Sequence, residues 1–157
     1  MVGRDNQELN KDILIAVDES PNARRAVIYV AKLLGGLKGC RVCLLHILSL
    51  PEEDFFPSPE AKETYRRNQR KKVDRMLEEY RQIIISYGFP AVDVSIYSPE
   101  RYCPSIAECI LSERDTLRAG TIVVGRKGVS RKEEFLFGSV SSMIVKKAKG
   151  CTIWVVE

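Results

Sequence analysis

Short apolar runs alternate with longer amphipathic stretches along this chain. Continuous apolar runs of four to eight residues, bounded by turn residues, are typical of buried parallel strands. Such runs predict strands at residues 13–17, 41–48, 121–124 and 152–156. A fifth run, residues 92–97, alternates apolar and polar positions, which indicates a strand at a sheet edge with one wetter face.

Between these runs, apolar residues recur at steps of three and four, the spacing of one face of an α-helix. The first helix is expected to begin at Pro21, after the N-cap Ser20, and to end at Gly35-Gly36. The other helices are expected at about residues 61–87, 104–117 and 139–149. Strands that alternate with helices predict an open, mostly parallel α/β sheet with helices on both faces, similar to a Rossmann fold. Residues 1–157 contain no linker or repeat, so we expect a single domain.

The composition limits the classes of protein to which the chain can belong. It has 157 residues, of which 45% are hydrophobic and 29% charged, as in an ordinary globular protein. No apolar run has the length of a membrane span, and the polar N-terminus has no secretory signal, so we expect a cytoplasmic protein without a membrane partner. The net charge of +4, from interspersed acidic and basic residues, does not indicate a nucleic-acid partner. The five cysteines fit reduced thiols better than a disulfide framework.

The loops that follow the first and fourth strands are the places to look for a ligand. In an open parallel sheet, ligands bind outside the carboxyl ends of the strands, where the strand order reverses. The second of these loops contains Gly125, Gly128 and Gly138, followed by Ser139 and Ser141. A helix that begins at Gly138 would direct free amides and its positive dipole end toward a ligand, and the serine hydroxyls can donate to phosphate oxygens. The pattern therefore predicts a phosphate site.

Other residues fit the remaining parts of a nucleotide. The carboxylate of Asp18 can accept hydrogen bonds from ribose hydroxyls, and Ile47 can form an apolar wall for a base. Positive charge along the glycine-containing loop comes from Arg126, Lys127, Arg131 and Lys132. Each feature also has a purely structural interpretation: the glycines shape a loop, Ser139 caps a helix, Asp18 helps Ser20 to cap the first helix, and the basic side chains form a solvated face.

Several other kinds of site are not supported. The chain has neither the G-x-G-x-x-G pattern of dinucleotide folds nor the G-x-x-x-x-G-K-[ST] pattern of P-loop proteins. Cys40 and Cys43 have the spacing of a metal or redox pair, but residues three apart on a strand face opposite ways, so ordinary thiols are expected. His46 is the only histidine and is expected in the core or at a strand end. The basic residues between 66 and 72 lie among acidic ones, which is typical of a solvated helix face.

The glycine segment also carries a family resemblance. The sequence Gly125-x2-Gly128-x9-Gly138-Ser139 resembles the ATP-binding motif of the universal stress protein family, and Gly138-Ser139-Val140-Ser141 resembles that family's helix start. Residues 13–20, 44–47 and 152–156 are similar to its first, second and last strands. The resemblance implies a five-stranded parallel sheet of order 3-2-1-4-5. It also implies ATP, or AMP or ADP, as the ligand, with Mg²⁺ or Mn²⁺.

The same resemblance assigns individual residues and an assembly. The implied nucleotide-binding residues are Ala16, Asp18, Ile47, Val124, Gly125, Lys127, Gly128, Gly138, Ser139, Val140 and Ser141. Arg126 departs from the family pattern, which has a small residue there. The last strand, Thr152–Val156, carries no charge or proline to protect an edge, and the resemblance makes it the contact of a homodimer.

The function expected from these features is a nucleotide-dependent regulator of a stress response that acts as a homodimer. A binding protein is favoured over an enzyme because Glu133 and Glu134, the acidic residues of the glycine-containing loop, have no partner in the sequence that would poise them as a base. The alternative is a slow ATPase or phosphotransferase that uses the same site. An adenylate-forming or electron-transfer protein is a third and weaker interpretation, because the loop after the first strand is not rich in glycine.

Overall fold

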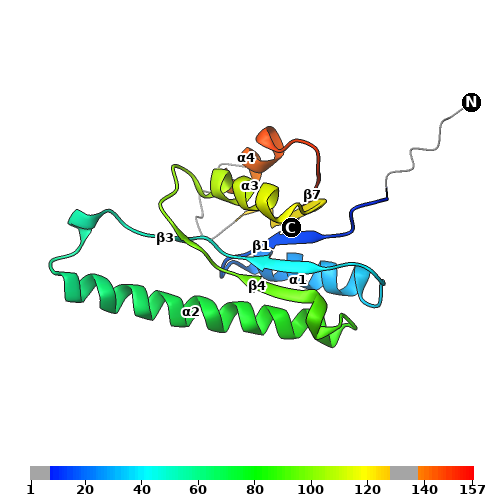
Figure 1. Ribbon diagram of the computed structural model, residues 1–157, viewed down its shortest axis with the longest axis horizontal. Coiled ribbons are helices and arrows are strands. Elements are labelled where there is room, and N and C mark those ends of the chain that lie inside the picture. Colours follow the sequence, from blue (N-terminus) through cyan, green and yellow to red (C-terminus); the bar gives the residue numbers. More distant parts are fainter. Residues whose placement is uncertain (1–7, 128–137) are drawn as a thin grey trace, which may run out of the picture.

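Five parallel strands form the central sheet of the protein (Figure 1). The computed structural model describes residues 8–127 and 138–157. In spatial order, the strands are β4 (Val94–Tyr97), β2 (Val42–Leu45), β1 (Ile13–Ala16), β6 (Thr121–Gly125) and β7 (Thr152–Val156). Counted along the chain within this sheet, the order is 3-2-1-4-5, as the family resemblance implied.

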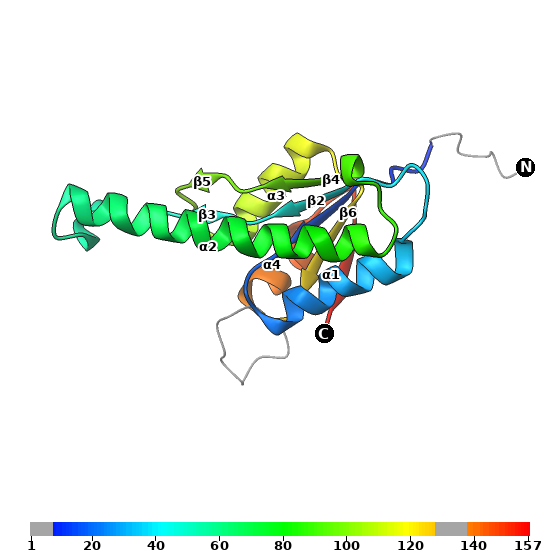
Figure 2. The same ribbon diagram turned by 90° about the horizontal axis from the view of Figure 1, so that it is seen from below.

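Two helices cover each face of the sheet (Figures 1 and 2). Helices α1 (Pro21–Leu34) and α2 (Pro59–Ser86) lie on one face, and α3 (Ile106–Leu117) and α4 (Ser139–Lys147) lie on the other. Successive strand residues point to opposite faces, so Ile15 joins the core beneath α1 and α2 while Leu14 joins the core beneath α3 and α4. Burial on both faces explains why the central strands read as continuous apolar runs.

Serine side chains fix where three of the helices begin. The hydroxyl oxygens of Ser20, Ser58 and Ser105 each accept a hydrogen bond from the amide three residues further on, at 3.1–3.2 Å. The predicted N-cap at Ser20 is therefore confirmed. Helix α4 differs, because its N-cap is Gly138, which has no side chain to satisfy the first amides.

Helix α2 is much longer than the sheet that it covers. Its 28 residues extend about 42 Å, whereas a five-residue strand extends about 17 Å. All of its buried residues lie in its second half: Val73, Met76, Leu77, Tyr80 and Ile84. The first half therefore projects beyond the carboxyl ends of the strands (Figures 1 and 2).

A small second sheet lies beside the projecting half of α2. It consists of β3 (Leu48–Ser49) and β5 (Glu100–Arg101), which pair in parallel. The prediction of one strand over residues 41–48 was wrong, because β2 covers Val42–Leu45 and a second strand, β3, begins at Leu48. Backbone hydrogen bonds from His46 N to Tyr97 O (3.1 Å) and from Leu48 N to Pro99 O (3.0 Å) carry the pairing across the interruption.

The remaining boundaries differ little from the expectations. Short 3₁₀ helices occupy Glu53–Phe55, in the loop before α2, and Ala91–Asp93, so that β4 begins at Val94 rather than at residue 92. β4 lies at one edge of the sheet, as its alternating sequence predicted, and β7 lies at the other. Among the described residues, none of the helices is both long and apolar enough to cross a membrane.

Candidate functional site

The start of α4 is held against the end of β6 by two hydrogen bonds to one carbonyl group. The carbonyl oxygen of Arg126 accepts from the amide of Gly138 at 2.8 Å and from the hydroxyl of Ser141 at 2.7 Å. The two ends of the predicted glycine segment are therefore together at the carboxyl edge of the sheet. Gly128, Arg131, Lys132, Glu133 and Glu134 lie outside the described residues.

The first amides of α4 lie ahead of the hydrogen-bond ladder of the helix. The first intrahelical hydrogen bond runs from Ser142 N to Gly138 O at 3.0 Å, so the amides of Ser139, Val140 and Ser141 precede the helical ladder. Ser139 is exposed and Val140 is half-buried, whereas Ser141 is only 2% exposed. The hydroxyl of Ser141 donates to backbone carbonyls, whereas Ser139, at the first helical position, is exposed to solvent.

Gly125 allows β6 to end directly against the start of α1. A Cβ atom at this position would lie 2.8 Å from the carbonyl carbon of Asn22 and 2.9 Å from the amide nitrogen of Ala23. Both are backbone atoms that cannot move aside, so the close approach requires glycine. On the neighbouring strand, Ala16 pairs in register with Val124, which is 3% exposed. The ends of β1 and β6 and the starts of α1 and α4 therefore meet at this edge.

Asp18 shapes the turn between β1 and α1. Its Oδ1 accepts a hydrogen bond from the amide of Ser20 at 2.8 Å, in agreement with the interpretation of this residue as a helper of the cap. Its carbonyl oxygen accepts from the hydroxyl of Tyr80 at 3.0 Å. Burial, together with the nearby Asp18 carboxylate, raises the pKa of Tyr80, so this phenol remains protonated as a donor. The Asp18 side chain itself is half-buried.

Ile47 lines a small pocket beyond the end of β2 and belongs to the same core as Val124, against which Ala16 also packs. The pocket has a volume of about 130 Å³, below the roughly 300–1,000 Å³ of typical small-molecule sites. Ile47 is 6% exposed, and neighbouring His46 places its Nδ1 2.7 Å from the carbonyl oxygen of Val17, which agrees with the expectation of a strand-end histidine. The pocket is lined by His46, Ile47, Leu48, Ser49, Leu50, Tyr65, Arg66, Gln69 and Glu100.

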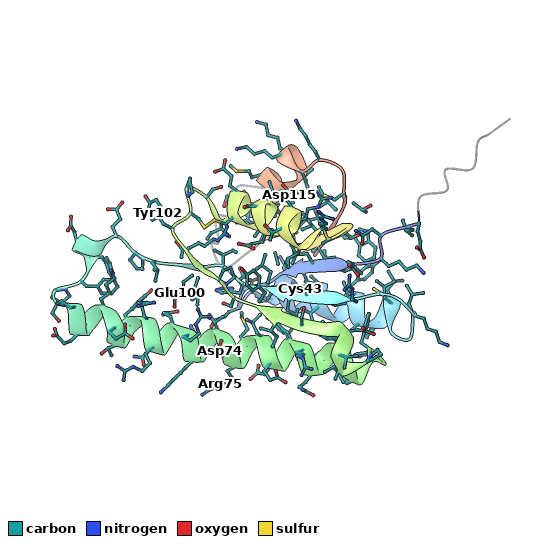
Figure 3. The ribbon with its side chains drawn as sticks, in the orientation of Figure 1. Cys43, Asp74, Arg75, Glu100, Tyr102 and Asp115 are labelled. Carbon is teal, nitrogen blue, oxygen red and sulfur yellow. A yellow bond between two sulfur atoms is a disulfide. The ribbon has the colours of Figure 1, made fainter. Side chains whose placement is uncertain are left out.

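Glu100 is the charged centre of this pocket's wall. It accepts hydrogen bonds from Arg66 at 2.5 Å and from Arg70 at 3.2 Å, and Arg70 also donates to the carbonyl oxygen of Ser98 at 2.9 Å. The hydrogen bond from Arg66 in particular holds the pKa of Glu100 below its usual range. Figure 3 shows Glu100, a residue of β5, beside α2.

Sequence reasoning did not find this network. We expected the basic residues between 66 and 72 to be a solvated face, but Arg66 and Arg70 pair with an acid about thirty positions away. A helical period places both on one face of α2, which was the available signal for a shared partner. No local pattern indicates that Glu100 is that partner.

Arg126, the residue that departs from the family pattern, interacts with the end of β7. The guanidinium of Arg126 forms an ion pair with Glu157, and its amide donates to the carbonyl oxygen of Val156 at 2.6 Å. Its charge is therefore partly neutralised beside the end of β7. Lys127 follows it and is half-buried.

The cysteines contradict the expectation of reduced thiols at one pair of positions. Cys103 and Cys109 form a disulfide, with their Cα atoms 6.0 Å apart. Cys40, Cys43 and Cys151 are free. Cys40 and Cys43 lie in the cores on opposite faces of the sheet, as expected from their spacing, and burial raises the pKa of both thiols. Across the described ranges, no group of three potential metal ligands occurs.

The model of the universal stress protein family matches residues 10–157. The chain belongs to this family. Comparison with curated proteins finds no match.

Solved structures that resemble this universal stress protein span almost the same length. The hypothetical protein MJ0577 has a TM-score of 0.79 at 23% identity, over 95% of this chain and 96% of that one. A universal stress protein in complex with cAMP has a TM-score of 0.67 at 16% identity, over 96% and 99% of the two chains. The universal stress protein from Archaeoglobus fulgidus in complex with dAMP has a TM-score of 0.61 at 21% identity, over 96% and 100%. At these identities the likeness shows a shared α/β fold.

Proposed function

We propose that this universal stress protein binds an adenine nucleotide, ATP or its relatives ADP and AMP, at the carboxyl edge of the sheet. The observation that carries the proposal is the start of α4, where three amides precede the helical ladder beside the end of β6. Such a helix start binds phosphate through its amides and its dipole. Two structural neighbours described as complexes with cAMP and dAMP support an adenine nucleotide as the ligand.

The proposal gives each part of the nucleotide a set of residues. The phosphates bind the amides of Ser139, Val140 and Ser141 and the exposed hydroxyl of Ser139, while Ser141 holds the helix start in place through Arg126. Lys127 and the glycines at positions 125, 128 and 138 complete the phosphate-binding segment. The ribose binds Asp18. The base lies against Ala16, Ile47 and Val124.

A divalent cation would be held mainly by the phosphates. The part of the chain that the structure describes has no group of three metal-ligating side chains. Mg²⁺ usually keeps several waters and takes one or two carboxylates in addition to substrate phosphates. We therefore expect Mg²⁺ or Mn²⁺ to bind through the nucleotide phosphates rather than through a cluster of side chains.

Calorimetric titration with ATP tests the proposal, with Gly138→Asp as the decisive variant. The backbone of Gly138 has φ −69° and ψ 161°, which aspartate adopts readily as a good N-cap. The variant should therefore keep α4, yet its carboxylate would occupy the first amides and repel phosphate. Ser142→Asp is the matched control, because it adds the same charge at an exposed position within the helix.

We expect saturable binding in the natural sequence, at least tenfold weaker binding in Gly138→Asp, and nearly unchanged binding in Ser142→Asp. If ATP, ADP and AMP all fail to bind the natural sequence, the proposal is wrong. Phosphate release well above that of Ser139→Ala would instead favour the alternative of a slow ATPase or phosphotransferase at the same site.

We also propose that the protein acts as a homodimer through β7, and that the nucleotide alters its shape or its partners in the cytoplasm. β7 is an edge strand of sequence TIWVV, and residues 153–156 are half-buried. An apolar edge without a protecting charge or proline favours pairing with a second strand. The family resemblance identifies the same strand as the dimer contact.

A further inference from the structure

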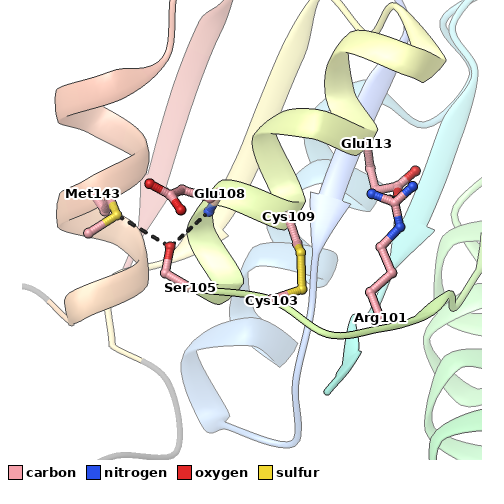
Figure 4. The surroundings of a disulfide bond; sticks show 7 residues. All are labelled: Arg101, Cys103, Ser105, Glu108, Cys109, Glu113 and Met143. Carbon is pink, nitrogen blue, oxygen red and sulfur yellow. Dashed lines mark hydrogen bonds and ion pairs between the residues drawn. A yellow bond between two sulfur atoms is a disulfide. The ribbon is translucent and has the colours of Figure 1, made fainter. Parts of the chain in front are cut away.

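A disulfide ties the connection after β5 to the first turn of α3 (Figure 4). Cys103 lies in that connection and is half-buried, while Cys109 lies in the helix and is 7% exposed. The bridge spans six positions along the chain, and it packs against the core beneath α3 and α4, to which Cys109 belongs. The two cysteines therefore differ in their exposure to solvent, Cys103 being the more exposed.

An ion pair between the partly exposed Arg101 and the buried Glu113 makes a second connection between the same two segments. Arg101 Nη1 lies 2.9 Å from Glu113 Oε1, and the Glu113 side chain is 1% exposed. Neither carboxylate oxygen of Glu113 has a hydrogen-bond partner among the described residues. Arg101, two positions before the bridged Cys103, is thus the counter-ion of the Glu113 carboxylate (Figure 4).

Apart from the bridge and the Arg101–Glu113 pair, the segment around β5 is held mainly by contacts with β3 and α2. Its pairing with β3 involves two residues, Glu100 opposite Leu48 and Arg101 opposite Ser49. Glu100 adds its ion pairs with Arg66 and Arg70 on α2. Segments held by a few short contacts open locally at low free energy, in contrast to the core strands. Loss of the bridge would therefore act first on this segment.

We propose that Cys103 and Cys109 form a thiol–disulfide exchange site, at which a dithiol reductant opens the bridge and releases the segment that carries Arg101 from α3. The site does not depend on the proposed nucleotide binding. Reduction would leave Arg101 and Glu113 as the remaining connection between the two segments.

The exchange begins at the more accessible sulfur. A thiolate of the reductant attacks Sγ of Cys103, the S–S bond breaks, and its electron pair passes to Sγ of Cys109. Cys109 leaves as a thiolate in the first turn of α3, where the helix dipole favours negative charge, and then takes up a proton. The second thiol of the reductant attacks the mixed disulfide and frees Cys103. In balance, the reductant is oxidised to a disulfide and the protein gains two electrons and two protons.

The other cysteines explain why the exchange would be selective. Burial raises the pKa of the Cys40 and Cys43 thiols, which keeps them protonated and weakly nucleophilic. The segment also lies beside α4, because Glu108 of α3 forms an ion pair with Lys147 at 2.6 Å and Ser105 Oγ lies 3.5 Å from Met143 Sδ. A change at the bridge would thus occur next to α4, whose first turn is the proposed phosphate site.

The first test measures the state and accessibility of the two thiols. The full chain, purified without reductant, is equilibrated with dithiothreitol or with oxidised glutathione, quenched in acid, alkylated, and analysed by peptide mass spectrometry. We expect the bridge to open in native buffer with dithiothreitol and to re-form with oxidised glutathione. Two outcomes overturn the proposal: thiols that glutathione never oxidises, or a bridge that dithiothreitol reduces only in denaturant.

Single variants test which sulfur is attacked. In Cys109→Ser, oxidised glutathione should form a mixed disulfide at Cys103 at least tenfold faster than it does at Cys109 in Cys103→Ser. Cys151→Ser, which removes a half-buried free thiol, is the matched control and should leave the natural bridge unchanged. Equal rates in the two variants would contradict attack at Cys103.

Hydrogen–deuterium exchange tests the release of the segment. In the natural sequence, reduction should speed amide exchange of peptides covering residues 98–105 at least tenfold, and leave peptides from β1 and β6 unchanged. This measurement needs no substitution, so it does not depend on whether the variants fold. Unchanged exchange over residues 98–105 after complete reduction would overturn the proposed release.

Discussion

The hydroxyl of Ser141 donates a hydrogen bond to the carbonyl oxygen of Arg126 at 2.7 Å. This contact joins the first turn of α4 to the end of β6 across a gap of fifteen positions. Ser141 is 2% exposed, so no solvent can replace the bond if it is lost. Two serines that are equivalent in the sequence motif thus have different surroundings, since Ser139 is exposed.

Replacing each serine by alanine should separate the structural role of Ser141 from the ligand contact proposed for Ser139. Ser141→Ala should lower the free energy of unfolding by about 1 kcal/mol, because a buried hydrogen bond is lost. Ser139→Ala should leave the stability nearly unchanged and weaken ATP binding. Urea denaturation and calorimetry measure the two effects, with exposed Ser142→Ala as the control. Equal stability of the Ser139 and Ser141 variants would contradict this division.

Gly125→Ala should destabilise the fold through a steric clash. The added methyl group would meet backbone atoms of Asn22 and Ala23 below 3.0 Å, and overpacking of this kind costs up to about 3 kcal/mol. Gly39→Ala is the control, because it adds a methyl group in open space at φ +77° and should cost about 1 kcal/mol. Thermal and urea unfolding give both values. A cost at Gly125 no larger than that at Gly39 would show that β6 need not approach α1 so closely.

The stabilising effect of Glu100 should depend on pH. Its pKa is lowered in the folded protein, first by the hydrogen bond from Arg66, so its contribution is fully present above the unfolded pKa of about 4.3 and is lost as the pH falls through the lowered folded value. Glu100→Gln should therefore lower the urea midpoint at pH 7, and the gap to the natural sequence should close as the pH falls from about 5 to about 2. A gap that is constant with pH would rule out this ionisation as the cause. Exposed Glu52→Gln is the control.

Arg101 and Glu113 should show strong coupling in a double-mutant cycle. Arg101→Met leaves the buried carboxylate of Glu113 without its partner and should cost about 3 kcal/mol. The double variant Arg101→Met, Glu113→Met replaces the pair with apolar side chains and should recover most of that stability. Urea denaturation of the four proteins under oxidising conditions gives the coupling free energy. Additive effects would mean that the two side chains act independently.

The proposed dimer should be sensitive to a proline in β7. The amide of Thr152 donates inward to Gly120 O at 2.9 Å, so by alternation the amide of Val155 points outward from the sheet edge. Val155→Pro removes that outward donor without removing a hydrogen bond to β6, and should convert a dimer to a monomer in sedimentation velocity. Ile96→Asp, on the opposite edge strand, is the control and should remain dimeric. A natural sequence that sediments as a monomer would refute the dimer itself.

Much of the fold follows from the sequence because its signals are local. Continuous apolar runs specify the central strands, alternation specifies the edge strand β4, and the Ser20-Pro21 pair specifies where α1 begins. These features depend on residues within one or two turns of each other, so periodicity and capping rules are sufficient to find them. The strand order came from the family resemblance rather than from periodicity.

The tertiary structure decided the contacts between segments that are distant along the chain. The interruption between β2 and β3, the pairing of Glu100 with Arg66 and Arg70, and the burial of Glu113 beside Arg101 depend on where elements end in space. The disulfide depended on a turn that brings the Cα atoms of Cys103 and Cys109 to 6.0 Å, which their spacing alone does not require. The sequence by itself thus determined the elements and the glycine-lined edge, because those are set by local backbone preference. Packing decided which charged side chains and which cysteines come into contact, because only the folded chain brings them close together.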